Sequence, residues 1–397
     1  MKYWRGYLVA AILALTTWGL TQLAAKYTVL VDMVYPYLTR TIQTFLSGWS
    51  SGVDFCVWQV AVVLLIVMLL ASIVLMIVLR WNFIQWLGWA LSGVMLVAFL
   101  HTGIYGLNYH AGPLAKDIRL EMTEYTLEEL EDTTVYYRDL ANDLANKMNR
   151  DANGDVLLSS FEDLAEQAGE GFNTLTYQQC YSIFAGATDP VKKLGWADMY
   201  TSMGITGMTM PITGEAAVNP QIPAISLPFT MCHEMAHRMC IAVERDANFA
   251  AFLSCRANSS EEFQYSAYFM AYRYCFSALS SVSSPEAATA TARIASGVNK
   301  NFAQDLKAYN QFFEEHQDED ATKLADTVND TYIKASGDDQ GVKSYGEVCD
   351  LLVNLYIKEI ILPAQKEENV SQFDPYDENQ VDLEGIVGAL PDEVPEE

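Results

Sequence analysis

The string His-Glu-Met-Ala-His at residues 233–237 is the part of the sequence that most directly indicates chemistry. If this segment is helical, His233 and His237 lie one turn apart on one face, where both imidazoles can bind a single zinc ion. Glu234 then lies beside the metal, where its carboxylate can take a proton from a zinc-activated water. The spacing therefore predicts a zinc site with Glu234 as general base.

A catalytic zinc site also needs a third protein ligand and one open position. Four nearby side chains could supply that ligand: Glu244, Asp246, Cys240 and Cys232. We expect Glu244, because it begins an ExxAN string like the one on the third-ligand helix of several glutamate-type zinc peptidases. On one continuous helix the carboxylate would lie about 10.5 Å along the axis from His237, which is too far. The helix is therefore predicted to break between about Met239 and Val243 and to restart near Glu244.

Two alternatives to this ligand set remain open. Comparable turns carry glycine where this chain has Cys240, which is poorly suited to a left-handed backbone, and its thiolate could instead be a ligand. The other alternative is that His233 and His237 are ordinary helix residues. The chain has only five histidines, however, and a chance match to HExxH in a chain of this size is on the order of one per cent.

Two further residues are predicted to support the chemistry. A developing negative charge on the scissile carbonyl needs a hydrogen-bond donor, and Tyr265, Tyr268 and Tyr272 share one face of the following helix. We predict Tyr268 in that role; the alternative is that this aromatic stripe belongs to the core. Asn248 is predicted to orient a ligand histidine ring.

The composition divides the chain into an apolar first part and an acidic second part. The formal net charge is −26, and 51% of the residues are hydrophobic. Such a charge argues against binding to nucleic acid, which needs clustered Lys and Arg, and against electrostatic docking on anionic lipid. The seven cysteines are an odd number, and their spacing matches neither a disulfide framework nor a CxxC zinc site.

Three apolar runs predict membrane-spanning helices. Each is long enough to cross the hydrocarbon core: about 7–25, 57–79 and 84–103. Lys2, Arg5 and Arg80 place the N-terminus and the tight turn between the last two runs in the cytoplasm. Three crossings then put the rest of the chain outside, and segment 26–55 is expected to be an external loop. A buried hydrophobic domain is the alternative, but uncharged runs of this length disfavour it.

The remainder predicts a mainly helical domain. Helices are expected at about 121–149 (with a Thr126–Glu129 capping box), 159–168, 247–255, 261–282, 285–313 and 345–362. Residues 151–155 predict a polar turn rather than a calcium loop, because the sixth position is Val156. Segment 205–213 predicts a short edge strand of the kind that receives substrate backbone. The organisation is then a membrane region over 1–106, an extracytoplasmic domain over 107–362 and a disordered acidic tail over 363–397.

Several strings resemble a known family. They are GLNYHAGPLAKDIRL after the third apolar run, TGEAAVNPQIPAISLPFTMCHEMAHRMCIAVERDANFAAFLSC around the HExxH motif, FQYSAYFMAY, and SYGEVCDLLVNLYI near the end. Together they resemble the domain-of-unknown-function 3810 family of bacterial membrane-anchored, zinc-peptidase-like proteins. The resemblance implies a zincin-like domain of the gluzincin type, with His233, His237 and Glu244 as zinc ligands. This chain departs from the family in having Cys240 where members carry glycine.

The sequence thus predicts a zinc metallopeptidase in a bacterial plasma membrane, with several passes and an extracytoplasmic domain. The expected partners are Zn²⁺, a peptide or protein substrate and the lipid bilayer, with no nucleic acid. A non-catalytic sensor or scaffold, which binds peptide or cell-envelope ligands, is the alternative. Intramembrane proteolysis is disfavoured, because HExxH lies about 130 residues beyond the last run, in a polar segment.

Overall fold

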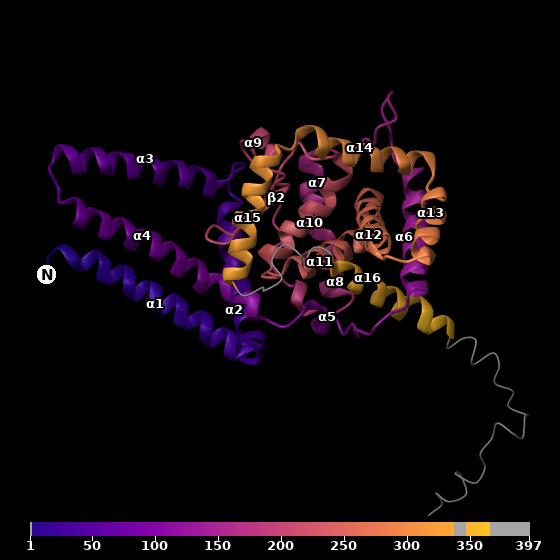
Figure 1. Ribbon diagram of the computed structural model, residues 1–397, viewed down its shortest axis with the longest axis horizontal. Coiled ribbons are helices and arrows are strands. Elements are labelled where there is room, and N and C mark those ends of the chain that lie inside the picture. Colours follow the sequence, from indigo (N-terminus) through magenta and orange to yellow (C-terminus); the bar gives the residue numbers. More distant parts are fainter. Residues whose placement is uncertain (1, 337–346, 366–397) are drawn as a thin grey trace, which may run out of the picture.

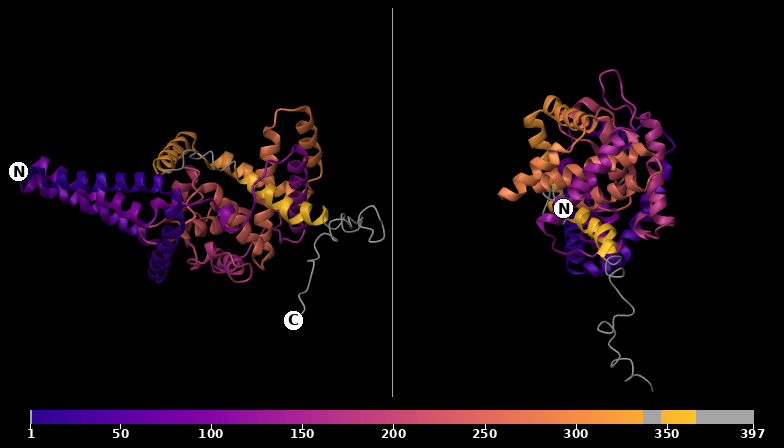
Figure 2. Two further views of the ribbon diagram at one scale, coloured as in Figure 1. Left: turned by 90° about the horizontal axis from the view of Figure 1, so that it is seen from below. Right: turned by 90° about the vertical axis from the view of Figure 1, so that its right-hand side faces the viewer.

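The computed structural model describes residues 2–336 and 347–365 (Figure 1). The regular secondary structure of the described residues is almost all helix, together with one small three-stranded sheet. Long helices project from one end, and the remaining helices form a compact domain (Figures 1 and 2). The predicted acidic tail, 363–397, lies outside the described residues from 366 onward. The prediction of a mainly helical protein is confirmed.

Three projecting helices are long and apolar enough to cross a membrane: α1 (Arg5–Lys26), α3 (Val57–Val78) and α4 (Phe83–Ile104). They coincide with the three predicted apolar runs. Helices α1 and α4 pack closely where Gly6 meets Gly88, and a Cβ on Gly6 would lie 2.4 Å from the Gly88 carbonyl carbon. The Ser92 hydroxyl donates to the Gly6 carbonyl at 2.7 Å. Small residues thus let these two backbones approach, as is usual between membrane helices.

The prediction of a loop over 26–55 is wrong, because most of this segment forms helix α2 (Thr28–Ser50). This helix contains Pro36 and carries apolar residues at helical spacing on its outer side, while its polar residues face the domain. Figures 1 and 2 show α2 running across the domain-proximal ends of the spans. A domain helix usually has the opposite arrangement, with its apolar side buried.

The domain follows the third span. Its α-helices are α5 (Leu114–Asp117), α6 (Leu127–Ala145), α7 (Phe161–Gln167), α8 (Gly169–Tyr177), α9 (Ala197–Ser202), α10 (Leu227–Arg238), α11 (Glu244–Ala257), α12 (Glu261–Ser281), α13 (Pro285–Ser296), α14 (Lys300–His316), α15 (Glu319–Ser336) and α16 (Val348–Tyr356). Helices α10, α11 and α12 pack on one another and contribute a large share of the core. The predicted Thr126–Glu129 capping box begins α6.

Some element predictions need correction. The single helix predicted over 285–313 is two helices, because the chain turns at Gly297 and Asn299 caps α14 by accepting from Phe302 N at 2.8 Å. Helices α8 and α15 were not predicted. The helix predicted over 345–362 is described only from residue 347, and α16 continues into a π-helix over Ile357–Ile361.

The sheet has the order β1 (Lys192–Lys193), β3 (Glu215–Val218), β2 (Gly207–Met210). Strand β1 pairs with β3 in parallel, and β2 pairs with β3 antiparallel. Strand β2 is therefore an edge strand, as predicted for segment 205–213, and it packs against α10.

A buried ion pair joins the sheet to α3, one of the three candidate membrane helices. Lys192 Nζ lies 2.8 Å from Glu215 Oε1, and both side chains are buried. The two carboxylate oxygens of Glu215 accept from the backbone N–H groups of Val57 and Trp58 at 2.7 and 2.9 Å. These are the first N–H groups of α3, which no carbonyl of the helix itself can satisfy. Glu215 thus caps a span from within the domain.

We expect Glu215→Gln to lower the free energy of unfolding by about 2 kcal/mol, because it leaves the buried Lys192 ammonium without a charged partner. Denaturant titration of the purified protein in detergent measures the change. The matched control is Glu162→Gln, which removes the exposed partner of the adjacent Lys193. That control should change stability by less than about 0.5 kcal/mol. Equal effects of the two substitutions would contradict the capping role.

Candidate metal centre

The metal-ligand segment begins with a helix that stops abruptly. Helix α10 ends at Arg238, Cys240 has φ +69°, and α11 begins at Glu244. Cys240 N donates to the His237 carbonyl at 2.8 Å, and Ile241 N donates to the Ala236 carbonyl at 3.1 Å. These bonds satisfy carbonyls at the end of α10 in the manner of a left-handed helix cap. The predicted break between Met239 and Val243 is confirmed, with a cysteine in the position that favours glycine.

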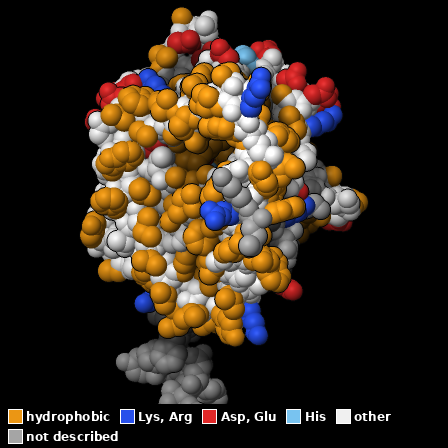
Figure 3. Space-filling model, turned by 90° about the vertical axis from the view of Figure 1, so that its left-hand side faces the viewer, with side chains coloured by type: hydrophobic (Ala, Val, Ile, Leu, Met, Phe, Trp, Pro, Cys, Tyr) orange, Lys and Arg blue, Asp and Glu red, His pale blue; other side chains and the backbone are white. Residues whose placement is uncertain are grey.

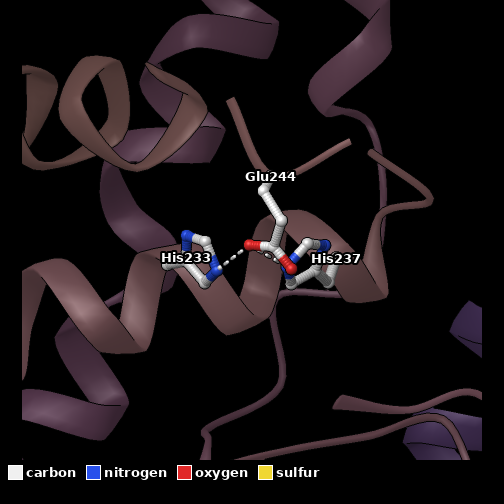
Figure 4. A group of neighbouring side chains, drawn as sticks. All are labelled: His233, His237 and Glu244. Carbon is white, nitrogen blue, oxygen red and sulfur yellow. Dashed lines mark ion pairs between the residues drawn. The ribbon is translucent and has the colours of Figure 1, made fainter. Parts of the chain in front are cut away.

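The break turns α11 back so that Glu244 meets the two histidines (Figure 4). Nε2 of His233 lies 3.3 Å from Oε2 of Glu244, and Nε2 of His237 lies 3.5 Å from the same oxygen. The three ligand atoms all lie within 4.8 Å of one another, and the side chains are 10–12% exposed. One nitrogen from each of two histidines and one carboxylate oxygen thus converge on a small, mostly buried volume.

The other three candidates for the third ligand point elsewhere. Asp246 Oδ2 accepts from Leu114 N at 2.9 Å and so attaches α5 to α11. The Cys232 thiol is buried and lies 3.6 Å from the Ala168 carbonyl oxygen. Cys240 is buried beside residues of α2. Among the described residues, Glu244 alone of the four completes the cluster.

Two of the three ligand–ligand separations in the cluster fit a tetrahedral zinc site. Nitrogen and oxygen ligands about 2.0–2.1 Å from a tetrahedral ion lie about 3.3–3.4 Å from one another. The two measured separations, 3.3 and 3.5 Å, are close to that edge length. Oε2 of Glu244 is also buried, and the only polar groups of the described residues that approach it are the two imidazole nitrogens, at distances longer than an ordinary hydrogen bond. A buried carboxylate oxygen flanked by two imidazole nitrogens fits a place beside a cation.

The backbone orients His237 for metal binding. Its Nδ1 lies 2.9 Å from the Ile241 carbonyl oxygen, so this nitrogen carries a hydrogen and leaves Nε2 to face Glu244. Burial by itself would lower the pKa of His237, but the carboxylates of Glu244 and Glu234 outweigh it and raise that pKa to about 9. Burial would raise the pKa of Glu244, but His237 and His233 together hold it well below its usual range. Glu244 is therefore ionised, as a ligand must be.

Glu234 lies under the edge strand. Its side chain is buried, and Thr209 Oγ1 of β2 lies 2.8 Å from both its Oε2 and its backbone carbonyl oxygen. Burial raises the pKa of Glu234, although His233, His237 and the Thr209 hydroxyl partly offset the effect. A carboxylate with a raised pKa is better able to hold a transferred proton near neutral pH.

Gly207 gives Glu234 the space that it occupies. A Cβ at position 207 would lie 2.5 Å from Oε1 of Glu234 and 2.8 Å from its carboxyl carbon. We expect Gly207→Ala to displace this carboxylate and to lower kcat by about 10²-fold if Glu234 is the general base. The zinc content should stay unchanged, because the three atoms that the new Cβ would meet first all belong to Glu234 and none to a metal ligand. An unchanged kcat would mean that the position of Glu234 does not matter for turnover.

Tyr268 does not lie at the cluster, which corrects the prediction of its role. Its ring packs against Tyr137 and Phe252, and Phe252 lies eight residues along α11 from Glu244, about 12 Å of helix. Only Asn258–Ser260 separates α11 from α12, so the two helices run antiparallel, and later residues of α12 lie nearer the metal ligands. The aromatic-core alternative is the one that the structure favours.

Asn248 lies one turn after Glu244, but its hydrogen bond goes to a tyrosine. The Tyr274 hydroxyl donates to Asn248 Oδ1 at 3.2 Å, while Asn248 Nδ2 and His233 Nδ1 have no partner among the described residues. The contact that would orient a histidine is therefore not formed, and Ile241 orients His237 instead.

Two tyrosines near the cluster were not predicted. Burial raises the pKa of Tyr274 and of Tyr105, and the nearby carboxylate of Glu244 raises each further. Glu234 also contributes to the shift of Tyr105, which follows the third span directly. Neither tyrosine had a distinguishing spacing in the sequence, because tertiary packing alone brings them here.

Comparison with known proteins places the chain in a family. A family model described as "Protein of unknown function (DUF3810)" matches residues 31–353, which include most of α2, two of the three candidate spans and the metal-ligand cluster. No curated protein and no solved structure matches the chain. The match covers most of the 397 residues, so this chain belongs to the DUF3810 family.

Proposed function

We propose that the protein is a membrane-anchored, zinc-dependent metallopeptidase with a zincin-like domain. The observation that carries the proposal is the convergence of His233, His237 and Glu244 after the break in the helix, with Glu234 buried beneath an edge strand. The cluster offers three ligands of the types that catalytic zinc sites use, two histidines and one glutamate. Three protein ligands leave a fourth position for water or substrate.

The residues have separable roles in peptide hydrolysis. A zinc ion held by the cluster would polarise a peptide carbonyl and lower the pKa of a bound water. Glu234 takes the proton from the attacking water and returns it to the leaving amine, and the Thr209 hydroxyl holds its carboxylate in place. No strand of the described residues pairs with the outer edge of β2, to which an extended substrate can add as a further strand.

The proposed location is extracytoplasmic. Lys2 precedes α1, Arg5 begins it and Arg80 lies between α3 and α4, so three positive charges flank one side of the spans, whereas Lys26 ends α1 on the domain side. The positive-inside rule puts the side with the three charges in the cytoplasm. The domain, at the opposite ends of the spans in Figure 1, then faces the outside of a bacterial plasma membrane.

Hydrolysis of a peptide library tests the proposal. The full chain in proteoliposomes, loaded with one equivalent of zinc, should cleave members of the library, and cleavage should stop on chelation and return with added zinc. Cleavage that survives chelation would contradict the proposed mechanism. If the zinc-loaded protein cleaves nothing but binds some library peptides, the domain is a peptide-binding sensor or scaffold.

Zinc affinity should rise with pH. Zinc binding through Nε2 requires a neutral imidazole, and the pKa of His237 is raised to about 9 in the metal-free protein. Below that pH the ion must displace one proton. We therefore expect the affinity to rise about tenfold per pH unit between pH 7 and 9 and then to level off. Competition with a chelator of known pH dependence measures the zinc affinity at each pH. A constant affinity over this range would contradict the assignment of His237 as a ligand.

A further inference from the structure

The outer face of α2 is apolar although it is exposed. Its exposed apolar side chains recur at helical spacing: Leu30, Met33, Val34, Leu38, Phe45 and Trp49. Phe45 is 75% exposed and Trp49 is 64% exposed. The opposite face carries the polar residues Thr39, Arg40, Gln43 and Ser47, all of them buried against the domain. An exposed apolar face of this kind marks a surface that contacts something other than water, such as lipid or another protein.

Both ends of α2 are attached to membrane spans. Only Tyr27 separates α1 from α2, and six residues separate α2 from α3. Figures 1 and 2 show α2 lying across the ends of the spans that are nearest the domain. Seen from the span end, the surface is mostly hydrophobic, and acidic side chains gather at its upper rim (Figure 3). Helix α2 thus lies at the level where the three apolar candidate spans meet the domain.

The buried face of α2 supports the turn that carries the third metal ligand. Arg40 Nε donates to the Met239 carbonyl at 3.2 Å, and Arg40 Nη1 donates to the Ser182 carbonyl at 3.0 Å. Thr39 contacts Cys240, the residue with the left-handed backbone. The helix that presents apolar residues outward is thus the direct support of the segment between His237 and Glu244.

We propose that α2 is an in-plane membrane helix whose outer face docks in the interface of the domain-side lipid leaflet, and that it thereby holds the metal centre at the membrane surface. The contact is apolar rather than electrostatic, which fits a protein of net charge −26. The substrate class, a conclusion that rests on the proposed peptidase function, is a polypeptide anchored in the same bilayer and cut close to it.

The geometry limits how far the scissile bond lies from lipid. The turn at Cys240 packs on the buried side of α2, so it is separated from the outer face by about one helix diameter, 10–12 Å. An extended chain covers about 3.3 Å per residue. About three to four extended residues cover that thickness, so a bond that reaches the metal centre lies at least that many residues from the membrane surface.

Fluorescence quenching tests the lipid contact without any need for activity. In a Cys180→Ser background, which removes the exposed cysteine, Phe45→Cys is labelled with an environment-sensitive dye in proteoliposomes. Nitroxides placed at shallow depth on lipids should quench it strongly, and aqueous iodide should quench it weakly. Leu65→Cys on α3 is the membrane control, and Leu157→Cys is an equally apolar, 51% exposed control in the domain.

Two outcomes would contradict the proposed contact between α2 and lipid. The Phe45 label could behave like the Leu157 label, accessible to iodide and not to lipid nitroxides. The label could also be shielded from both quenchers while Phe45→Cys crosslinks to a second copy, which would make the outer face of α2 a protein interface.

Substrates with different linkers test the substrate class. One susceptible peptide sequence is attached to a membrane anchor through 6 or 20 residues and compared with the free peptide. We expect both anchored forms to be cut at rates within about threefold of each other and at least tenfold faster than the free peptide. Failure of the 6-residue form while the 20-residue form is cut would overturn the placement of the site. If none is cut, the peptidase function fails, and the quenching result still decides the docking of α2.

Discussion

Glu234→Gln should reduce peptide hydrolysis by about 10²- to 10⁴-fold while zinc stays bound. The amide cannot accept the proton that the carboxylate takes from the attacking water, and general-base catalysis contributes a factor of this size. The substitution keeps the shape of a buried side chain, and the Thr209 hydroxyl can still donate to the amide oxygen. Initial rates on the best peptide of the library, with zinc content measured on the same samples, check the prediction.

Glu261→Gln is the matched control for this change. Glu261 is half-exposed at the start of α12 and pairs with Lys147 on the surface, so its substitution should leave both hydrolysis and zinc content unchanged. Full activity of Glu234→Gln would show that another group moves the proton. A loss of zinc together with activity would show that Glu234 has a structural rather than a catalytic role.

His233→Ala should abolish stoichiometric zinc binding and hydrolysis together. Removal of one of three ligands leaves His237 and Glu244, which cannot by themselves hold the ion in competition with water and buffer. Zinc in excess also stabilises the native protein by mass action, by about 4 kcal/mol at a thousandfold excess over Kd. The wild type should therefore unfold at a higher temperature with zinc, and the variant should show no such shift.

His316→Ala is the control for this variant. His316 is exposed on α14, and its Nδ1 lies 2.8 Å from a carbonyl oxygen of its own helix. Its substitution should leave zinc binding and the zinc-dependent rise of the unfolding temperature intact. A variant His233→Ala that still binds one zinc per chain would place the metal elsewhere, and the ligand set would have to be revised.

The site was predictable where local rules dominate. The spacing of His233 and His237 follows from helix geometry, and a helix that continued past His237 would carry Glu244 too far along its axis. The break was therefore predictable even though Cys240 lacks the usual glycine signal. Contacts with α2 stabilise the turn at that cysteine, and no local pattern indicates them.

The position of Tyr268 away from the cluster was not predictable because it depends on how α11 and α12 align. Tyr268 was selected for its spacing within one helix, but the short connection at Asn258–Ser260 fixes which residues of α12 lie beside Glu244. In the structure Tyr268 lies beside Phe252, and Tyr274 lies beside Asn248. Spacing within one helix does not contain that information.

Among the membrane-proximal elements, the spans were predictable and α2 was not. Uninterrupted apolar runs identify α1, α3 and α4 from composition alone. Helix α2 contains a proline, and its apolar residues recur at helical spacing among polar ones, a pattern that does not show which of its two faces is buried. Its assignment depends on which face the domain covers, which is a property of the tertiary structure.

Anomalous diffraction at the zinc edge, on the full chain with one equivalent of zinc, tests the central claim most directly. We predict one strong peak per chain, about 2.0–2.2 Å from Nε2 of His233, from Nε2 of His237 and from a carboxylate oxygen of Glu244, with one position left open. A peak coordinated by Cys240 or Cys232, or a zinc ion bound without Glu244, would contradict the account.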